Sequence, residues 1–184
     1  LTGVREDGSV SGLTSYGMIG VELISSNGDE LQIKNGETAT ITMTVPVALQ
    51  SSAPASIPLW HFDEVAGIWV EEGSAELVNG QYIGEVSHFS FWNCDAPYPL
   101  INLSGVFTSQ GIEMENMLVE VEVESSGALG TGYTNSEGRY SGKVPADESL
   151  RVRAYDYCNQ LVFSSPSVGP FNGDWEMNPQ EVAF

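Results

Sequence analysis

The feature that most constrains this chain is the alternation of apolar and polar residues in short runs that end at turn residues. Residues 38–45 alternate Thr with apolar side chains, and residues 117–124 end in three Val-Glu repeats. Such alternation places successive side chains on opposite faces of a strand, one toward the core and one toward water. Turn signals such as Asn79-Gly80 separate the runs, and no segment carries a 3.6-residue apolar stripe. The sequence therefore predicts an all-β protein.

The chain has 184 residues, which suits two small β-domains better than one. The segment Ala96-Pro97-Tyr98-Pro99 has two prolines in four residues, as expected of a short, semi-rigid linker. The alternating pattern restarts beyond it, and each half has the size of an immunoglobulin-like sandwich, about 90 residues. We therefore predict two tandem β-sandwiches of the immunoglobulin-like or transthyretin-like type: domain 1–95, linker 96–99 and domain 100–184.

The second half carries the motif Thr-Asn-Ser-Glu-Gly-Arg-Tyr at residues 134–140, after a Gly-containing run at 103–106 and the alternating run at 118–121. Asn135 can form an Asx turn there, and Gly138 can take a positive φ. Over residues 99 to 184 these features resemble the carboxypeptidase regulatory-like (transthyretin-like) domain. That family lacks catalytic residues, so the resemblance implies a spacer, adhesion or accessory domain.

Five segments of the first half carry a second resemblance: residues 16–19, 36–41, 57–63, 67–73 and 88–93. Together they resemble the β-rich module of large secreted bacterial proteins of the Bacteroidota type and of cartilage intermediate layer proteins. It is more distantly similar to the ZU5 fold. The resemblance implies an extracellular or cell-surface location. In such proteins the first strands lie upstream of the position of Leu1, which implies an incomplete first sandwich.

His88-Phe89-Ser90 lies in a strand-like run, and some ZU5 relatives cleave themselves between Phe and Ser of such a tripeptide. In that reaction the Ser90 hydroxyl would attack the Phe89 carbonyl, with His88 as general base. The favoured alternative is an ordinary strand. In that case Phe89 and Phe91 fill the core, while His88 and Ser90 hydrogen-bond each other or face the second domain.

Trp60 and Trp69 are expected on adjacent strands, where their rings could form a sugar-stacking platform for surface glycans. In a small sandwich, core packing is the favoured interpretation of both rings.

The formal net charge is -19, from 25 acidic and six basic residues. A polyanion repels phosphate backbones and anionic membranes, so we predict no nucleic-acid partner. No apolar run approaches the roughly 20 residues of a membrane span, so we predict no membrane insertion.

The only histidines are His61 and His88, and their spacing resembles no zinc site, so the sequence predicts no metal site and no cofactor. Calcium is the second interpretation of the acidity. Its candidate ligands are Asp63 with Glu64, and Asn135 with Glu137. Neither loop has the alternating ligands of an EF-hand, and solvated turn side chains are favoured.

Cys94 and Cys158 fall in different predicted domains. An interdomain disulfide and two separate thiols are both consistent with this placement.

Motifs of the common enzyme classes, such as the nucleophile elbow, the phosphate-binding glycine loop and the Rossmann fingerprint, do not occur in the sequence. We therefore predict a non-enzymatic structural, spacer or adhesion module of a secreted or cell-surface bacterial protein. Its expected partners are neighbouring domains of the same protein or like subunits, reached through exposed strand edges. A self-cleaving module and a carbohydrate-binding module are the alternatives.

Overall fold

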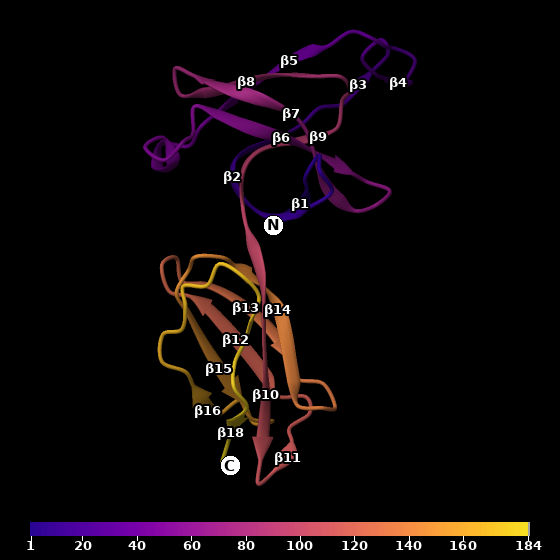
Figure 1. The fold of residues 1–184 in the computed structure, drawn as a ribbon. Coiled ribbons are helices and arrows are strands. Elements are labelled where there is room, and N and C mark those ends of the chain that lie inside the picture. The colour runs from indigo at the N-terminus through magenta and orange to yellow at the C-terminus, as the bar shows by residue number, and fades with distance from the viewer. Residues whose placement is uncertain (184) are drawn as a thin grey trace. The chain divides into compact units, whose positions relative to one another are not determined.

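The computed structural model describes residues 1–183 and confirms the all-β prediction (Figure 1). Besides strands it contains one 3-10 turn, η1 (Val47–Leu49). Within residues 1–183 no helix is both long and apolar enough to cross a bilayer. The contacts divide the chain into unit 1, Leu1–Tyr98, and unit 2, which begins at Pro99.

The predicted linker 96–99 is mostly strand. Residues 96–98 end β9 (Phe91–Tyr98) and pair with β2 (Val10–Gly20), with Pro97 opposite Leu13. On its other edge β9 pairs with β6 (Ser56–Asp63) only over residues 92–94. Pro97 therefore lies where one edge of β9 is not paired with β6, a setting in which a residue without an N–H is tolerated. Only Pro99 separates β9 from β10 (Leu100–Ser109).

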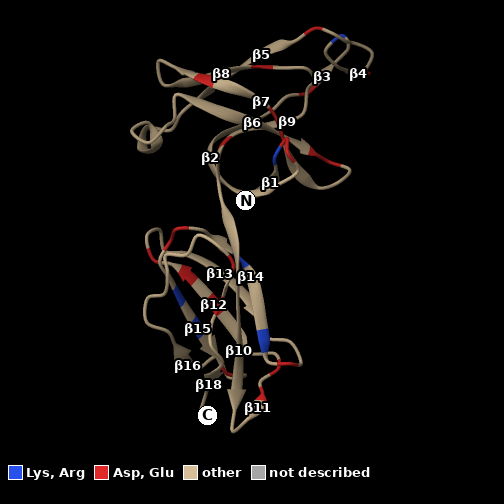
Figure 2. Ribbon diagram, viewed as in Figure 1, with Lys and Arg blue, Asp and Glu red and all other residues tan. Residues whose placement is uncertain are grey.

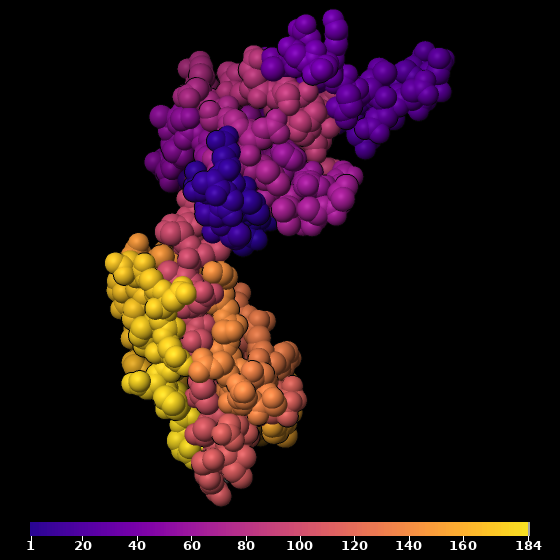
Figure 3. All heavy atoms as spheres, turned by 45° about the vertical axis from the view of Figure 1, so that its right-hand side comes forward, coloured from indigo at the N-terminus to yellow at the C-terminus, as the bar shows by residue number. Residues whose placement is uncertain are grey.

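Unit 1 is built on one seven-stranded sheet in the order β1-β2-β9-β6-β7-β8-β5, rather than on the two separate sheets of a sandwich. Strand β1 pairs antiparallel with β2 and parallel with β7, so that part of the sheet closes on itself. A hairpin of β3 and β4 stands away from the rest of the unit (Figures 1 and 3). The remaining strands of unit 1 are β1 (Thr2–Val4), β3 (Leu23–Ile24), β4 (Glu30–Leu31), β5 (Ala39–Thr44), β7 (Ile68–Val78) and β8 (Gln81–Val86).

The core of unit 1 follows from the alternation in its strands. On β5, Ile41 and Met43 are buried, whereas Thr40, Thr42 and Thr44 are exposed. The largest fully buried side chains in the unit are Trp60, Trp92 and Tyr82. Buried aromatic rings of this size contribute much of the apolar area that stabilises a small domain.

Unit 2 consists of two sheets packed face to face. One sheet joins β11, β10 and β14, with β17 and β18 on β10, and the other has the order β13-β12-β15-β16. Both sheets contribute to one core, which includes Leu103 and Phe107 from the first and Val119, Leu150 and Val152 from the second. The strands are β11 (Ile112–Glu113), β12 (Leu118–Val123), β13 (Ala128–Tyr133), β14 (Arg139–Pro145), β15 (Leu150–Tyr155), β16 (Leu161–Ser164), β17 (Trp175–Glu176) and β18 (Gln180–Glu181).

The glutamates that alternate along β12 lie opposite the arginines of β15 (Figure 2). Arg153 forms ion pairs with Glu120 and Glu122, and Arg151 pairs with Glu124, just past the end of β12. The predicted polar face of this strand is therefore a cross-strand charge ladder. Such pairs are partly screened by solvent and favour one register more than they add stability.

The turn between β13 and β14 contains the predicted Asx turn at Asn135 and the predicted positive φ at Gly138. The Asn135 side-chain oxygen accepts hydrogen bonds from the backbone N–H groups of Glu137 and Arg139, each at 3.0 Å. Gly138 has φ 67°, and a Cβ there would lie 2.4 Å from the Phe107 carbonyl oxygen. Only glycine fits this position, because both the dihedral angle and the close backbone approach exclude a side chain.

Gly138→Ala should destabilise unit 2 by at least about 1–2 kcal/mol, the cost of a left-handed conformation before the clash with β10 is added. The matched control is Gly142→Ala on β14, where a Cβ would meet nothing within 4 Å; its effect should stay within about 0.5 kcal/mol. Denaturant unfolding of both variants measures the difference. Equal stabilities would contradict the role of Gly138.

Candidate functional site

In the part of the chain that the structure describes, one group of three metal-ligating side chains converges: His61, Glu72 and His88. One ligand atom from each lies within 4.8 Å of the others. His61 lies on β6 and Glu72 on β7, while His88 lies in the connection 87–90 between β8 and β9. Two paired strands and an irregular connection therefore meet at one point of unit 1.

Strand pairing explains this convergence. His61 lies opposite Val70 on β7 and opposite Trp92 on β9. Glu72 is two residues beyond Val70, so it lies on the same face of the sheet as His61, on the diagonal. The fully buried Trp92 supports both imidazoles, with ring centroids 5.6 Å from His61 and 4.9 Å from His88.

Glu72 lies between the two histidines. Its Oε2 is 3.1 Å from His61 Nδ1 and 3.3 Å from His88 Nε2. Its other oxygen, Oε1, accepts a 2.9 Å hydrogen bond from the Ser87 hydroxyl. Ser87 thereby orients the carboxylate so that Oε2 faces both imidazole rings.

The contact between His61 and Glu72 is short enough for an ion pair, but burial lowers the pKa of His61 more strongly than Glu72 raises it. The net effect lowers the pKa of His61 and favours its neutral form. Burial acts to raise the pKa of Glu72, but hydrogen bonds from Ser87 and His88 outweigh it and lower the pKa overall. Glu72 is thus a carboxylate at neutral pH. His61 Nδ1 is buried and makes no hydrogen bond. The His61 nitrogen without a partner and the Glu72 carboxylate oxygen face each other, and a cation could bind between them.

The cluster borders a pocket of about 560 Å³ in unit 1. His61 and His88 line the pocket together with Asp63, Glu64 and Ser90. The cluster is therefore accessible from solvent on one side, and the buried Trp92 supports the rings of both histidines.

The predicted strand through His88-Phe89-Ser90 is wrong, because residues 87–90 form an irregular connection. The Gln32 side chain takes the place of a neighbouring strand: it accepts from the Phe89 N–H at 2.7 Å and donates to the Phe89 carbonyl at 3.1 Å. Ser90 Oγ donates to the Phe62 carbonyl at 3.3 Å, whereas His88 contacts Glu72. The structure thus gives base and nucleophile different partners. Phe91, expected in the core, is 44% exposed.

The favoured interpretation of the tryptophans, core packing, is confirmed for Trp60, and the alternative of a sugar-stacking platform is wrong for this residue. Trp60 is fully buried, and its indole N–H donates to the Asp95 carbonyl at 2.9 Å. Trp69 is half-buried and packs against Phe62, with ring centroids 5.2 Å apart. A buried ring has no face for a sugar, so Trp60 cannot contribute to a stacking platform.

Two of the residues considered for calcium, Asp63 and Asn135, accept hydrogen bonds from backbone N–H groups of their own turns. Asp63 Oδ1 accepts hydrogen bonds from the N–H groups of Val65 and Ala66, each at 2.9 Å. The Asn135 oxygen accepts two backbone bonds in the same way. Asx turns of this kind account for both side chains without an ion.

Both cysteines are free thiols, so the interdomain disulfide is not formed. Cys94 is fully buried in the core of unit 1, whereas Cys158 is exposed. Of the two arrangements consistent with the sequence, the structure has separate thiols, because the Cys94 side chain points into its own core.

No sequence pattern pointed to Glu72 or Ser87 as site residues. Glu72 is one of 25 acidic residues, and nothing local distinguishes it from the others. The two histidines were noted, but their spacing along the chain does not predict that β6 and the β8–β9 connection meet.

No protein-family model matches the chain, and no curated protein matches it. Similar solved structures include a streptococcal ancillary pilin, with 11% identity, a TM-score of 0.35 and coverage of 79% of this chain and 69% of that one. The Bacillus anthracis TIE protein has 12% identity, a TM-score of 0.37 and coverage of 96% and 42%. A 9R-lipoxygenase from Cyanothece has 16% identity and a TM-score of 0.30 over 45% of this chain; the match spans only 16% of the lipoxygenase. With TM-scores below 0.5, these similarities carry no argument about function.

The two thiols should differ in reactivity. Burial raises the pKa of Cys94 to about 12, and its sulfur is inaccessible, so a thiol reagent should label only Cys158 in the native protein. Mass spectrometry should find one label in native protein and two in denaturant. Labelling that requires prior reduction would instead indicate a disulfide.

The chain should remain uncut at Phe89-Ser90, because the Ser90 hydroxyl bonds to Phe62 and His88 contacts Glu72. Denatured, reduced wild-type protein should give a single species near 19.8 kDa, the same as Ser90→Ala apart from the lost oxygen. Two wild-type fragments that Ser90→Ala does not form would establish self-cleavage.

Proposed function

We propose that this chain is a non-enzymatic structural or adhesion module of a secreted or cell-surface bacterial protein that associates with a second copy of itself through strand β13. The observation that carries the proposal is that β13 has an unpaired, solvent-exposed edge. It is an edge strand paired only with β12, and all six of its residues are exposed.

Exposed sheet edges are usually protected by charged side chains, prolines or bulges. Strand β13 has none of these protections: its sequence is Ala-Leu-Gly-Thr-Gly-Tyr, and its register with β12 is uninterrupted. In Figure 2 the strand has neither acidic nor basic colouring. Leu129 and Tyr133 are 59% and 68% exposed. An unprotected edge with exposed apolar side chains is a site for strand addition.

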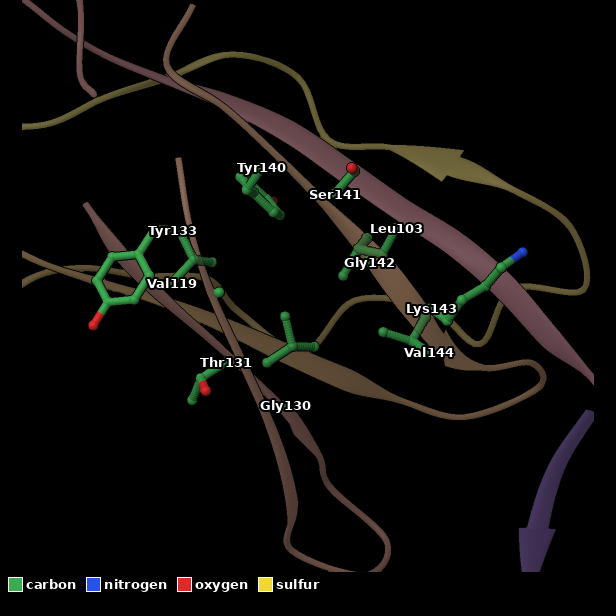
Figure 4. A pocket seen from close by; sticks show the side chains of 12 residues that line it. Leu103, Val119, Gly130, Thr131, Tyr133, Tyr140, Ser141, Gly142, Lys143 and Val144 are labelled. Atoms are coloured by element: carbon green, nitrogen blue, oxygen red, sulfur yellow. The ribbon is translucent and has the colours of Figure 1, made fainter. Parts of the chain in front are cut away.

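A groove of about 260 Å³ lies between β13 and β14 (Figure 4). Leu103, Val119 and Val144 contribute apolar lining. Gly132 and Gly142 border it, and a Cβ at either position would meet nothing within 4 Å. Side chains of an added strand can enter this space, so the edge offers apolar contact as well as backbone hydrogen bonds.

Charge decides how a second copy can bind. Each copy has a net charge of -19, which opposes association over most of the surface. Two β13 strands, however, can pair antiparallel around a two-fold axis without placing like charges opposite each other. We therefore expect a dimer that strengthens as salt screens the remaining repulsion.

The resemblance of the first half to modules of secreted bacterial proteins supports the proposed location. The different partners of His88 and Ser90, together with the buried Trp60, favour this function over self-cleavage and sugar binding.

The backbone geometry identifies the decisive substitution. Just past the end of β13, the Thr134 N–H donates to the carbonyl of Met117, the residue before β12. Hydrogen-bonded and non-hydrogen-bonded pairs alternate along an antiparallel ladder, so the N–H of Thr131 points toward the free edge. Thr131→Pro therefore removes an edge donor while sparing the bonds to β12. Thr131→Val keeps the donor and serves as the matched control.

Sedimentation equilibrium at low and moderate salt should show a salt-strengthened dimer for wild type and Thr131→Val. Thr131→Pro should remain monomeric, as should Thr131→Lys, which adds a charge to the edge instead of removing a donor. Circular dichroism verifies that each variant is folded. A monomeric wild type at all concentrations, or equal dimerisation of all variants, would refute self-association through β13.

A further inference from the structure

We propose that His61, Glu72 and His88 bind one divalent transition-metal ion, with Zn²⁺ preferred, and that the ion cross-links β6, β7 and the 87–90 connection. This site lies in unit 1 and is independent of the edge strand β13.

The distances suit a tetrahedral ion. Zinc binds His nitrogen and carboxylate oxygen at about 2.0–2.2 Å, and tetrahedral geometry then places ligand atoms roughly 3.3–3.5 Å apart. The separations from Glu72 Oε2 are 3.1 Å to His61 Nδ1 and 3.3 Å to His88 Nε2. The third separation, between the two imidazole nitrogens, is at most 4.8 Å, so small side-chain shifts would bring all three ligands onto one ion.

The donor set selects the class of metal. Two imidazole nitrogens and one carboxylate oxygen suit zinc and neighbouring first-row metals, whereas calcium and magnesium prefer oxygen ligands alone. His61 Nδ1 is buried without a hydrogen bond and faces a carboxylate oxygen. A cation between this nitrogen and the carboxylate oxygen would give both atoms a partner.

Neighbouring side chains hold the three ligands in place, as is usual around protein metal sites. Ser87 donates to Glu72 Oε1 and leaves Oε2 for the ion. Trp92 packs against both imidazoles, and the two imidazoles meet edge to face with centroids 5.0 Å apart. Such supporting contacts orient ligands and typically change metal affinity by about 10- to 100-fold.

Three protein ligands leave one tetrahedral position open, and His61 and His88 both border the 560 Å³ pocket. Water from the pocket can complete the coordination. The ion would tie an irregular connection, which lacks strand pairing of its own, to two paired strands. Because the ligands meet only in the folded protein, binding should stabilise unit 1.

Calorimetric titration with ZnCl₂ at pH 7.5 tests the site. The protein is the full chain without a histidine tag, in a Cys158→Ser background that removes the exposed thiol as a competing ligand. We expect one ion per chain. His88→Gln and Glu72→Gln should each abolish saturable binding, and Ser87→Ala should weaken it about 10-fold. Glu64→Gln is the matched control: it removes an exposed carboxylate of the same pocket and should bind as wild type.

Two further readouts separate coordination from general cation attraction. Co²⁺ in place of Zn²⁺ should give the visible absorption of a tetrahedral ion, and this band should be absent in His88→Gln. Zinc should raise the thermal unfolding temperature of the parent protein and of Glu64→Gln, but not that of His88→Gln, whose fold is verified by circular dichroism. Binding that is equal in all variants, or no saturable binding by the parent protein, overturns the site. Saturable binding without thermal stabilisation overturns the cross-linking role.

Discussion

Unit 1 depends on the pairing of β6 with both β7 and β9. The β7 pairing runs along almost all of β6, and the β9 pairing adds Leu59 opposite Cys94, Trp60 opposite Asn93 and His61 opposite Trp92. This register buries Leu59 and Trp60 and brings His61 to the ring of Trp92. A shift of one residue would exchange the faces of β6 and separate His61 from Glu72. Core and metal-ligating cluster therefore rest on the same set of backbone hydrogen bonds.

The connection 87–90 shows how an irregular segment acquires a defined geometry. Backbone groups without a strand neighbour still need hydrogen-bond partners. Gln32 supplies two of them to Phe89, and the Ser90 carbonyl accepts from the Val21 N–H. The same departure from strand geometry places His88 beside Glu72. The irregular backbone at 87–90 therefore explains why His88 and Ser90 contact different residues. It also explains why His88 lies near His61 and Glu72, where we propose a metal site.

The two proposals use different properties of the β-architecture. In unit 2, two sheets share one core and β13 leaves an unprotected edge, so association through that edge needs no rearrangement of the core. In unit 1, the sheet returns on itself through β1, and the cluster lies where three segments meet. The edge pairing that we propose for unit 2 and the metal site that we propose for unit 1 would both hold segments together.

The sequence by itself determined the strands and their turns. Alternation specified the buried and exposed sides of β5 and β12, and the chemistry of Asn135 and Gly138 specified the turn before β14, because these features depend on neighbours a few residues away. Only the tertiary structure decided that Trp60 is buried, that Cys94 points into its own core, and that His61, Glu72 and His88 meet. Those outcomes depend on register between distant strands. Register is set by the packing of the whole unit, so no local pattern could reveal it.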